Sequence, residues 1–285
     1  MTLWLNAVLA TVLMTSAPAE RDSTDFVGDG VFYATIEGPA MDKAGNLYAV
    51  NLGSEGTIGK VSRDGKAQLY LSLPQGSIGN GIRFDRKGQM FIADYTGHNI
   101  WRYDGKQLTL HSHEARMFQP NDLTIADNGV IFASDPDWAN RQGQFWRIGL
   151  DGKAQLMESG MGTTNGIEIS PDQRRLYINE SAQRRVWVYD LDTELNPGNK
   201  RLLIEFADFG LDGMRCDKEG NLLIARYGKG TVAKVSPQGE LLREYRLKGE
   251  FPTNVTFDSQ NPDLLYVTLQ KRGAVELLKL TTDSH

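Results

Sequence analysis

Residues 81–94 read GIRFDRKGQMFIAD, two short runs of apolar and β-branched residues on either side of a polar turn. Five further segments repeat this pattern, and the six copies begin at residues 38, 81, 122, 166, 213 and 254. Counted from the first residue of a copy, the fifth position is Asp in four copies and the eighth is Gly in four copies. The pattern is typical of a β-hairpin, so each copy predicts two antiparallel strands.

A second module lies between the hairpins, for example NIWRYDGKQLTLH at residues 99–111, which turns at Asp104-Gly105. It adds two strands, so that each unit contains four antiparallel strands. The units recur at intervals of 43, 41, 44, 47 and 41 residues, which is the length of one propeller blade. The sequence therefore predicts an all-β fold, a six-bladed β-propeller.

The ends of the chain indicate how the propeller closes. Only a short polar tail follows Leu280, so the last unit has three strands of its own. We expect the run VFYATI at residues 31–36 to supply the fourth as an N-terminal strand, which would hide the sheet edge. No linker interrupts residues 26–280, which are predicted to form a single domain.

The first residues of the chain have the pattern of a targeting segment. The apolar run LWLNAVLATVLM at residues 3–14 is too short to span a bilayer, and Ala17 and Ala19 have the spacing of a signal-peptidase site. Residues 1–19 are therefore predicted to be a signal peptide, although no Lys or Arg precedes the apolar run. The mature protein would be exported to a periplasm or secreted, without a membrane anchor.

Charge and motif content argue against several classes of protein. The chain has 31 Lys and Arg against 36 Asp and Glu residues and no basic run, which argues against a nucleic acid partner. Cys216 is the single cysteine, and its apolar neighbours favour a small buried hydrophobic residue over a nucleophile. No Gly-x-Ser-x-Gly motif is present, which argues against a serine hydrolase.

In a propeller the first strand of every blade lines the central channel, so the residues just before the six repeats form a ring on one face. These ring residues are Glu37, Asn80, Asn121, Asn165, Asp212 and Thr253. Asn-Gly and Asp-Gly are also common turn pairs, which would explain each pair singly but not Glu37. All but Thr253 offer a carboxylate or amide oxygen, the ligands that calcium prefers. The ring therefore predicts a site for Ca²⁺ or another divalent cation.

The loops between the second and third strands open on the same face as the ring. We expect their side chains to shape a pocket for a small molecule, with packing between blades as the alternative for the aromatic ones: Asp94, Tyr95, His98, Asp137, Trp138 and Tyr227. His98 is either an exposed loop residue or a proton shuttle.

Four motifs together resemble the senescence-marker-protein/gluconolactonase/luciferin-regenerating-enzyme family, over roughly residues 30–280: Glu37-Gly38-Pro39, Gln119-Pro120-Asn121-Asp122, Thr164-Asn165-Gly166 with Ser170-Pro171-Asp172, and Leu211-Asp212-Gly213. Members of this family are six-bladed propellers with one catalytic divalent metal, usually calcium, and many hydrolyse lactones. The resemblance implies that Glu37, Asn165 and Asp212 bind the metal directly. Asn121 would be a further ligand, or would hold a metal-bound water or a substrate oxygen.

Sugar-lactonase members of the family often carry Arg where this chain has Gln119. A neutral amide forms no charge-assisted hydrogen bond, so neutral lactones are expected in preference to acidic ones. The predicted substrate-binding residues are Asn80, Tyr95, His98, Gln119, Asn121, Trp138 and Tyr227. Asp212 is the expected catalytic residue, as general base for the attacking water or, as the second choice, as nucleophile.

The predicted function is therefore an exported, calcium-dependent lactone hydrolase, with two alternatives open. Residues 80–104 also resemble an NHL-type repeat, whose propellers often bind protein or RNA without catalysis. The same metal site could instead serve phosphotriester hydrolysis or a lyase-type reaction, because fold alone does not decide chemistry. The sequence leaves the particular lactone and the oligomeric state open.

Overall fold

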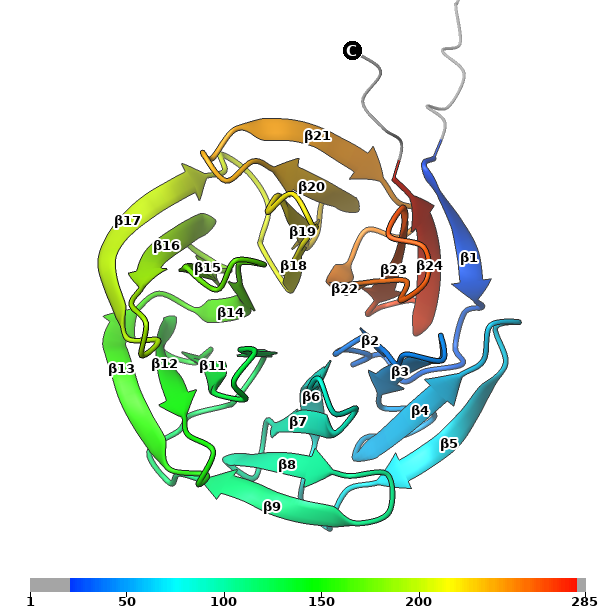
Figure 1. The fold of residues 1–285 in the computed structure, drawn as a ribbon. Coiled ribbons are helices and arrows are strands. Elements are labelled where there is room, and N and C mark those ends of the chain that lie inside the picture. Colours follow the sequence, from blue (N-terminus) through cyan, green and yellow to red (C-terminus); the bar gives the residue numbers. More distant parts are fainter. Residues whose placement is uncertain (1–20, 281–285) are drawn as a thin grey trace, which may run out of the picture.

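The computed structural model describes residues 21–280, which fold into 24 β-strands and contain no helix. The strands form six four-stranded sheets, arranged around a central channel as the blades of a propeller (Figure 1). The all-β, six-bladed architecture predicted from the repeats is therefore confirmed. Within this range no helix is available that could cross a membrane.

The blades are numbered in chain order, and their strands pair antiparallel from the channel outward. Blade 1 contains β2 (Ala40–Met41), β3 (Leu47–Val50), β4 (Thr57–Val61) and β5 (Ala67–Ser72). Blade 2 contains β6 (Gly79–Phe84), β7 (Met90–Asp94), β8 (Asn99–Tyr103) and β9 (Leu108–His113). Blade 3 contains β10 (Leu123–Ile125), β11 (Ile131–Asp137), β12 (Gln142–Ile148) and β13 (Ala154–Met161). Blade 4 contains β14 (Thr164–Ile169), β15 (Arg175–Glu180), β16 (Arg185–Leu191) and β17 (Pro197–Glu205). Blade 5 contains β18 (Met214–Cys216), β19 (Leu222–Arg226), β20 (Thr231–Val235) and β21 (Leu241–Arg246). Blade 6 contains β22 (Pro252–Phe257), β23 (Leu264–Leu269), β24 (Ala274–Lys279) and β1 (Ser23–Val27).

Strand β1 closes the propeller, because it pairs antiparallel with β24 at the outer edge of blade 6 (Figure 1). An N-terminal closing strand is thus confirmed, but the prediction that residues 31–36 supply it is wrong. Those residues connect blade 6 to blade 1, and their apolar members Phe32 and Ile36 are only 3% and 0% exposed. The alternation of apolar residues in this run therefore reflects the burial of Phe32 and Ile36, and not pairing at a sheet edge. Phe32 forms only an isolated antiparallel β-bridge, with Leu52. The propeller also begins at Ser23, three residues before the predicted domain start.

The repeated Asp and Gly residues build the turns between the first and second strands of the blades. Asp85 Oδ1 accepts hydrogen bonds from the backbone N–H groups of Lys87 at 2.9 Å and Gln89 at 2.8 Å. Gly88 has a φ of 83°, in the left-handed region that glycine reaches without strain. The repeat that reveals the fold is therefore explained by local turn chemistry at the end of the blades away from the ring residues.

Apolar side chains pack between neighbouring blades. One cluster joins Phe132 and Phe145 of blade 3 to Ile167 and Ile178 of blade 4, all 0% exposed. Cys216 packs against a similar cluster between blades 4 and 5, where burial raises the pKa of its thiol. A thiol held protonated is a poor nucleophile, which agrees with the hydrophobic role expected for it. Because the apolar cores lie between blades, the central channel is left to polar side chains.

Candidate active site

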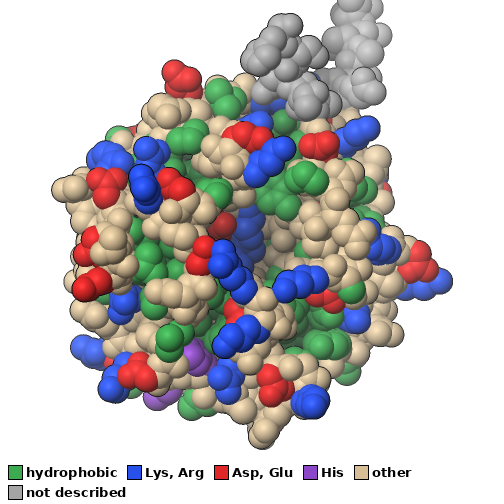
Figure 2. Space-filling view, viewed as in Figure 1, with side chains coloured by type: hydrophobic (Ala, Val, Ile, Leu, Met, Phe, Trp, Pro, Cys, Tyr) green, Lys and Arg blue, Asp and Glu red, His purple; other side chains and the backbone are tan. Residues whose placement is uncertain are grey.

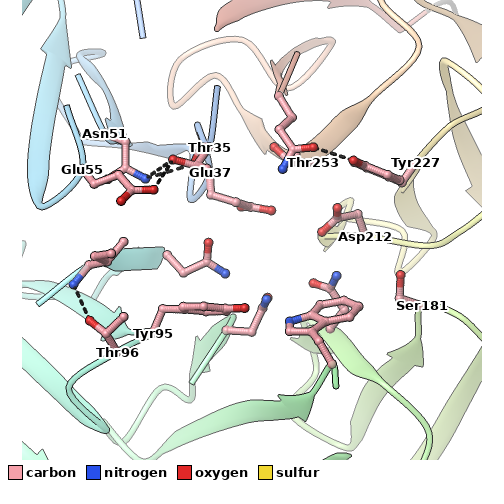
Figure 3. A pocket seen from close by; sticks show the side chains of 17 residues that line it. Thr35, Glu37, Asn51, Glu55, Tyr95, Thr96, Ser181, Asp212, Tyr227 and Thr253 are labelled. Atoms are coloured by element: carbon pink, nitrogen blue, oxygen red, sulfur yellow. Dashed lines mark hydrogen bonds between the residues drawn. The ribbon is translucent and has the colours of Figure 1, made fainter. Parts of the chain in front are cut away.

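The ring residues lie together around one mouth of the central channel, as the propeller geometry requires. They line a cavity of about 420 Å³: Glu37, Asn80, Asn121, Asn165, Asp212 and Thr253. Figure 3 shows this cavity. Blades 1 to 6 follow one another counterclockwise in Figure 3, whereas they follow one another clockwise in Figure 1. The two figures therefore view opposite ends of the channel.

Crowding in the channel explains why glycine follows several ring residues. A Cβ atom on Gly213 would lie 1.9 Å from Cγ of Asn254, and one on Gly38 would lie 2.0 Å from the backbone oxygen of Asn80. Glycine at these positions lets the inner strands of adjacent blades approach each other. Turn chemistry alone therefore does not account for the Asp-Gly and Glu-Gly pairs, because close approach also requires the glycine.

Glu37 and Asp212 face each other across the cavity (Figure 3), and each is only 8% exposed. Glu37 Oε2 accepts a hydrogen bond from the N–H of Gly38 at 2.6 Å and from the side-chain amide of Asn254 at 3.2 Å. Burial, and then the charge of Asp122, raise the pKa of Glu37 to about 7. Burial, and then the charge of Glu37, raise the pKa of Asp212 well above its usual range. When both carboxyl groups are ionised, their like charges repel each other, and a cation between them would stabilise the pair.

Asn165 supplies a buried acceptor that the surrounding chain leaves free. Its Oδ1 atom has no hydrogen-bond partner among the described residues, although the residue is only 2% exposed. No group of three or more His, Cys, Asp or Glu side chains in residues 21–280 is arranged to hold a metal ion. A cation in this cavity would thus need amide oxygens, such as those of Asn165 and Asn121, besides the two carboxylates. Such a mixed set of oxygen donors fits a hard cation of the Ca²⁺ type.

A network of buried charges, which the sequence analysis missed, fills the channel beneath the cavity. Arg83 donates to Asp122 Oδ1 at 2.9 Å and lies 3.4 Å from Glu168. Arg215 donates to Asn254 Oδ1 at 3.2 Å and lies 3.6 Å from Asp122. Burial, and then the charge of Arg83, lower the pKa of Arg215 to about 10. The sequence does carry a signal for this network, because the third position of the repeat is polar in five of the six copies: Arg83, Thr124, Glu168, Arg215 and Thr256.

Three of the predicted loop residues, Tyr95, Trp138 and Tyr227, line the cavity, whereas Gln119 and His98 do not. The side-chain oxygen of Gln119 accepts a hydrogen bond from the N–H of Trp138 at 3.4 Å. His98 Nδ1 lies 2.5 Å from the carbonyl oxygen of Met117. Gln119 therefore supports the Trp138 loop, and the role predicted for these two residues in substrate binding stays a prediction.

Asp94 does not line the cavity either, because its carboxylate is used inside blade 2. It is 0% exposed and accepts hydrogen bonds from Ser77 Oγ at 2.7 Å, Gly97 N at 2.9 Å and Trp101 Nε1 at 2.9 Å. Asp137 is likewise occupied by the side chain of Asn140 at 2.7 Å. The cavity is completed by residues that the sequence analysis did not single out: Thr35, Asn51, Glu55, Ile78, Gly79, Thr96, Ser181 and Gln270.

Comparison with known proteins gives a consistent result. The family description SMP-30/Gluconolactonase/LRE-like region matches residues 29–271 of the chain. The gluconolactonase of Zymomonas mobilis subsp. mobilis is 28% identical over 272 residues, which cover 82% of this chain and 74% of the relative. The 6-deoxy-6-sulfogluconolactonase of Pseudomonas putida is 33% identical over 228 residues, which cover 75% of this chain and 76% of the relative. Among solved structures, a calcium-binding protein, regucalcin, from Agrobacterium tumefaciens shares the fold with a TM-score of 0.76 at 22% identity, covering 90% of this chain and 94% of that one. The chain therefore belongs to the SMP-30/gluconolactonase/LRE-like family.

Proposed function

We propose that the protein is a lactone hydrolase that depends on a divalent cation, with Ca²⁺ as the expected ion. Membership of the family, and the two relatives named for sugar lactones, support this class of reaction. The observation that carries the proposal is the cavity floor, where two buried carboxyl groups and the unpartnered Oδ1 of Asn165 line one cavity. Without a cation, ionising both carboxyl groups would place two like charges close together, and the acceptor of Asn165 would stay unsatisfied; both cost stability.

The balance of buried charge also favours a divalent ion. Four carboxyl groups but only two guanidinium groups meet in and below the cavity: Glu37, Asp122, Glu168, Asp212, Arg83 and Arg215. Fully ionised, this set carries two negative charges in excess, and buried charge needs a compensating partner. One divalent cation held by Glu37, Asp212, Asn165 and Asn121 would supply it.

When bound, the cation would polarise the lactone carbonyl and offset the negative charge that develops on its oxygen. Asp212, ionised when the cation is bound, would accept a proton from the attacking water, whose oxygen forms a bond to the carbonyl carbon. The ring C–O bond then breaks, and the leaving oxygen takes up the proton that Asp212 holds, giving the hydroxy acid. Direct attack by Asp212 is the second possibility.

The remaining cavity walls suit a polyhydroxylated ring. Asn80 and Asn121 offer amide groups that both donate and accept hydrogen bonds, and Tyr95 offers a hydroxyl. Trp138 adds a flat apolar surface on which a sugar ring could lie. Residues 1–19, the predicted signal peptide, lie outside the described residues, so export to a periplasm or the medium stays part of this proposal.

The test is pH-stat measurement of D-glucono-1,5-lactone hydrolysis above its spontaneous rate. We expect chelation to remove the turnover and added Ca²⁺ to restore it. Asp212→Asn should lose about a hundredfold or more in kcat, whereas Asp192→Asn, in an exposed turn of blade 4, should leave it unchanged. A single turnover in ¹⁸O-water would label Asp212 only if this residue is the nucleophile.

Four results would contradict the proposal. Turnover that survives chelation would remove the cation from the reaction, and turnover of the wild-type size in Asp212→Asn would remove the assigned base. A protein that binds Ca²⁺ but opens no lactone would instead favour phosphotriester or lyase chemistry on the same site. A protein that does neither would favour a binding propeller.

A further inference from the structure

Glu55 places a third carboxylate on the cavity wall, nearer to solvent than the other two. It comes from the loop between β3 and β4 and is exposed, whereas Glu37 and Asp212 are each 8% exposed. Glu55 Oε1 accepts a hydrogen bond from Thr35 Oγ1 at 3.3 Å, and no basic side chain of residues 21–280 forms an ion pair with it. The cavity mouth therefore holds an uncompensated negative charge.

Hydrogen bonds hold the Glu55 loop in place. Asn51 Nδ2 donates to the carbonyl oxygen of Thr35 at 3.0 Å, and Asn51 Oδ1 accepts from the N–H of Gly56 at 3.2 Å. Thr57 Oγ1 donates to the carbonyl oxygen of Ser54 at 2.8 Å and closes the loop from its other end. Figure 3 shows Asn51, Thr35 and Glu55 together on the blade 1 side of the cavity. The carboxylate is thus presented from a fixed backbone.

Positive side chains are missing from this cavity. None of the 17 residues that line it is Lys, Arg or His, and three of them are acidic. Lys and Arg side chains do gather around the central hollow at the opposite end of the channel (Figure 2). Lys271 follows the lining residue Gln270 in sequence but does not line the cavity itself. Its Nζ lies over the ring of Phe251, 3.5 Å from the centroid. Even with a divalent cation balancing Glu37 and Asp212, the cavity keeps one negative charge.

We propose that Glu55 makes this enzyme select neutral polyhydroxy lactones against lactones with an anionic group at the end of the ring away from the carbonyl. The inference rests on the proposed function. With the carbonyl at the buried floor, the far substituent of a six-membered lactone points toward the mouth, where Glu55 lies. There a hydroxyl donates to the carboxylate, whereas a sulfonate or phosphate is repelled by it.

The experiment compares two lactones that differ in this one group, D-glucono-1,5-lactone and its 6-deoxy-6-sulfo analogue. The wild-type protein should prefer the neutral lactone in kcat/KM. Glu55→Gln should reduce this preference about fivefold, the size of a close charge pair in water, mainly through KM for the sulfonated lactone. Glu55→Lys should reduce it further, and high salt should shrink the wild-type preference because exposed charges are screened.

The matched control is Glu240→Gln, an exposed residue in the turn between β20 and β21, which should keep the wild-type preference. If Glu55→Gln and the wild type show the same preference, the inference about Glu55 is overturned. Turnover of the neutral lactone in the same experiment would leave the proposed function standing. A wild-type preference for the sulfonated lactone would overturn it in the same way. Turnover of neither lactone would overturn both.

Discussion

Asn254 donates from its side-chain amide to Glu37 Oε2 at 3.2 Å, which ties blade 6 to the ring residue of blade 1. The same nitrogen lies 3.2 Å from Asp122 Oδ2, and Asn254 Oδ1 accepts from Arg215 at 3.2 Å. One neutral side chain thus connects a carboxylate of the cavity to the charge network beneath it. It holds Glu37 toward Asp212 without adding a charge of its own.

Replacing Asn254 should therefore loosen the cation site without removing any of its oxygen donors. We expect Asn254→Ala to weaken Ca²⁺ binding about tenfold and to lower the free energy of unfolding by about 2 kcal/mol, because two buried carboxylates lose a donor. Calorimetric Ca²⁺ titration and urea denaturation measure the two effects. Asn128→Ala, in an exposed turn, serves as control. Unchanged Ca²⁺ affinity together with lost stability would show that Asn254 only supports the fold.

Glu37→Gln should separate stability from cation binding. In chelator at pH 8, where Glu37 with its pKa of about 7 is ionised, the neutral variant avoids the cost of burying this charge beside Asp122. We expect its free energy of unfolding to exceed that of the wild type by about 1–2 kcal/mol. Ca²⁺ at about a hundredfold excess over Kd should stabilise the wild type by about 2.7 kcal/mol and the variant far less. A variant that is less stable than the wild type in chelator would show that the buried charge of Glu37 does not cost stability. A variant that still gains the full stabilisation from Ca²⁺ would show that Glu37 does not hold the cation. Glu240→Gln is the control.

The fold could be predicted because its signals are local. Each copy of the repeat carries its own turn, such as Asp85 with Gly88, so six independent segments point to the same unit. The closing strand could not be located, because its choice depends on pairing with β24, about 250 residues away along the chain. Strand β1 reads STDFV and is mostly polar, whereas the run at residues 31–36 has the stronger apolar alternation.

The ring residues could be placed because they hold the same position in successive repeats. The neighbours of this ring could not, because the path of each loop decides which side chain reaches the cavity. Gln119 lies close to Asn121 in sequence, yet its side chain is taken up by Trp138 N–H. Glu55 is an acidic residue in a polar loop and has no distinguishing pattern, so only the folded loop reveals that it lines the cavity.

The buried carboxylate of Asp94 should make blade 2 sensitive to acid. Burial alone would raise the pKa of Asp94, but hydrogen bonds from Ser77, Asn99 and Trp101 outweigh it and hold the pKa below the usual 3.8. A lowered folded-state pKa means that the stabilisation is complete above pH 3.8 and is lost as the pH falls through the folded value. Asp94→Asn should thus cost about 2 kcal/mol at pH 7 and progressively less below pH 3.8.

Urea denaturation of the wild type and Asp94→Asn at pH 7, 5 and 3.5 measures this difference. Asp263→Asn, in an exposed turn, should show no difference at any of these values. A gap between Asp94→Asn and the wild type that stays constant from pH 7 to 3.5 would mean that the charge of Asp94 is not what stabilises the loop.

Closure of the propeller should depend on Arg272, which reaches from blade 6 to the first strand. Its guanidinium donates to Asp25 Oδ1 at 2.8 Å, Asp29 Oδ1 at 2.8 Å and Glu276 Oε1 at 2.5 Å. Glu276 is 0% exposed, so Arg272→Ala would leave a buried carboxylate without its cation. We expect a loss of about 3 kcal/mol in the free energy of unfolding, and faster hydrogen exchange in β1 than in β22. Arg201→Ala, whose exposed partner is Asp190, should cost less than about 1 kcal/mol. If β1 keeps its protection in Arg272→Ala, closure of the propeller does not depend on Arg272, and backbone pairing with β24 and the remaining contacts of Ser23 and Asp25 are sufficient.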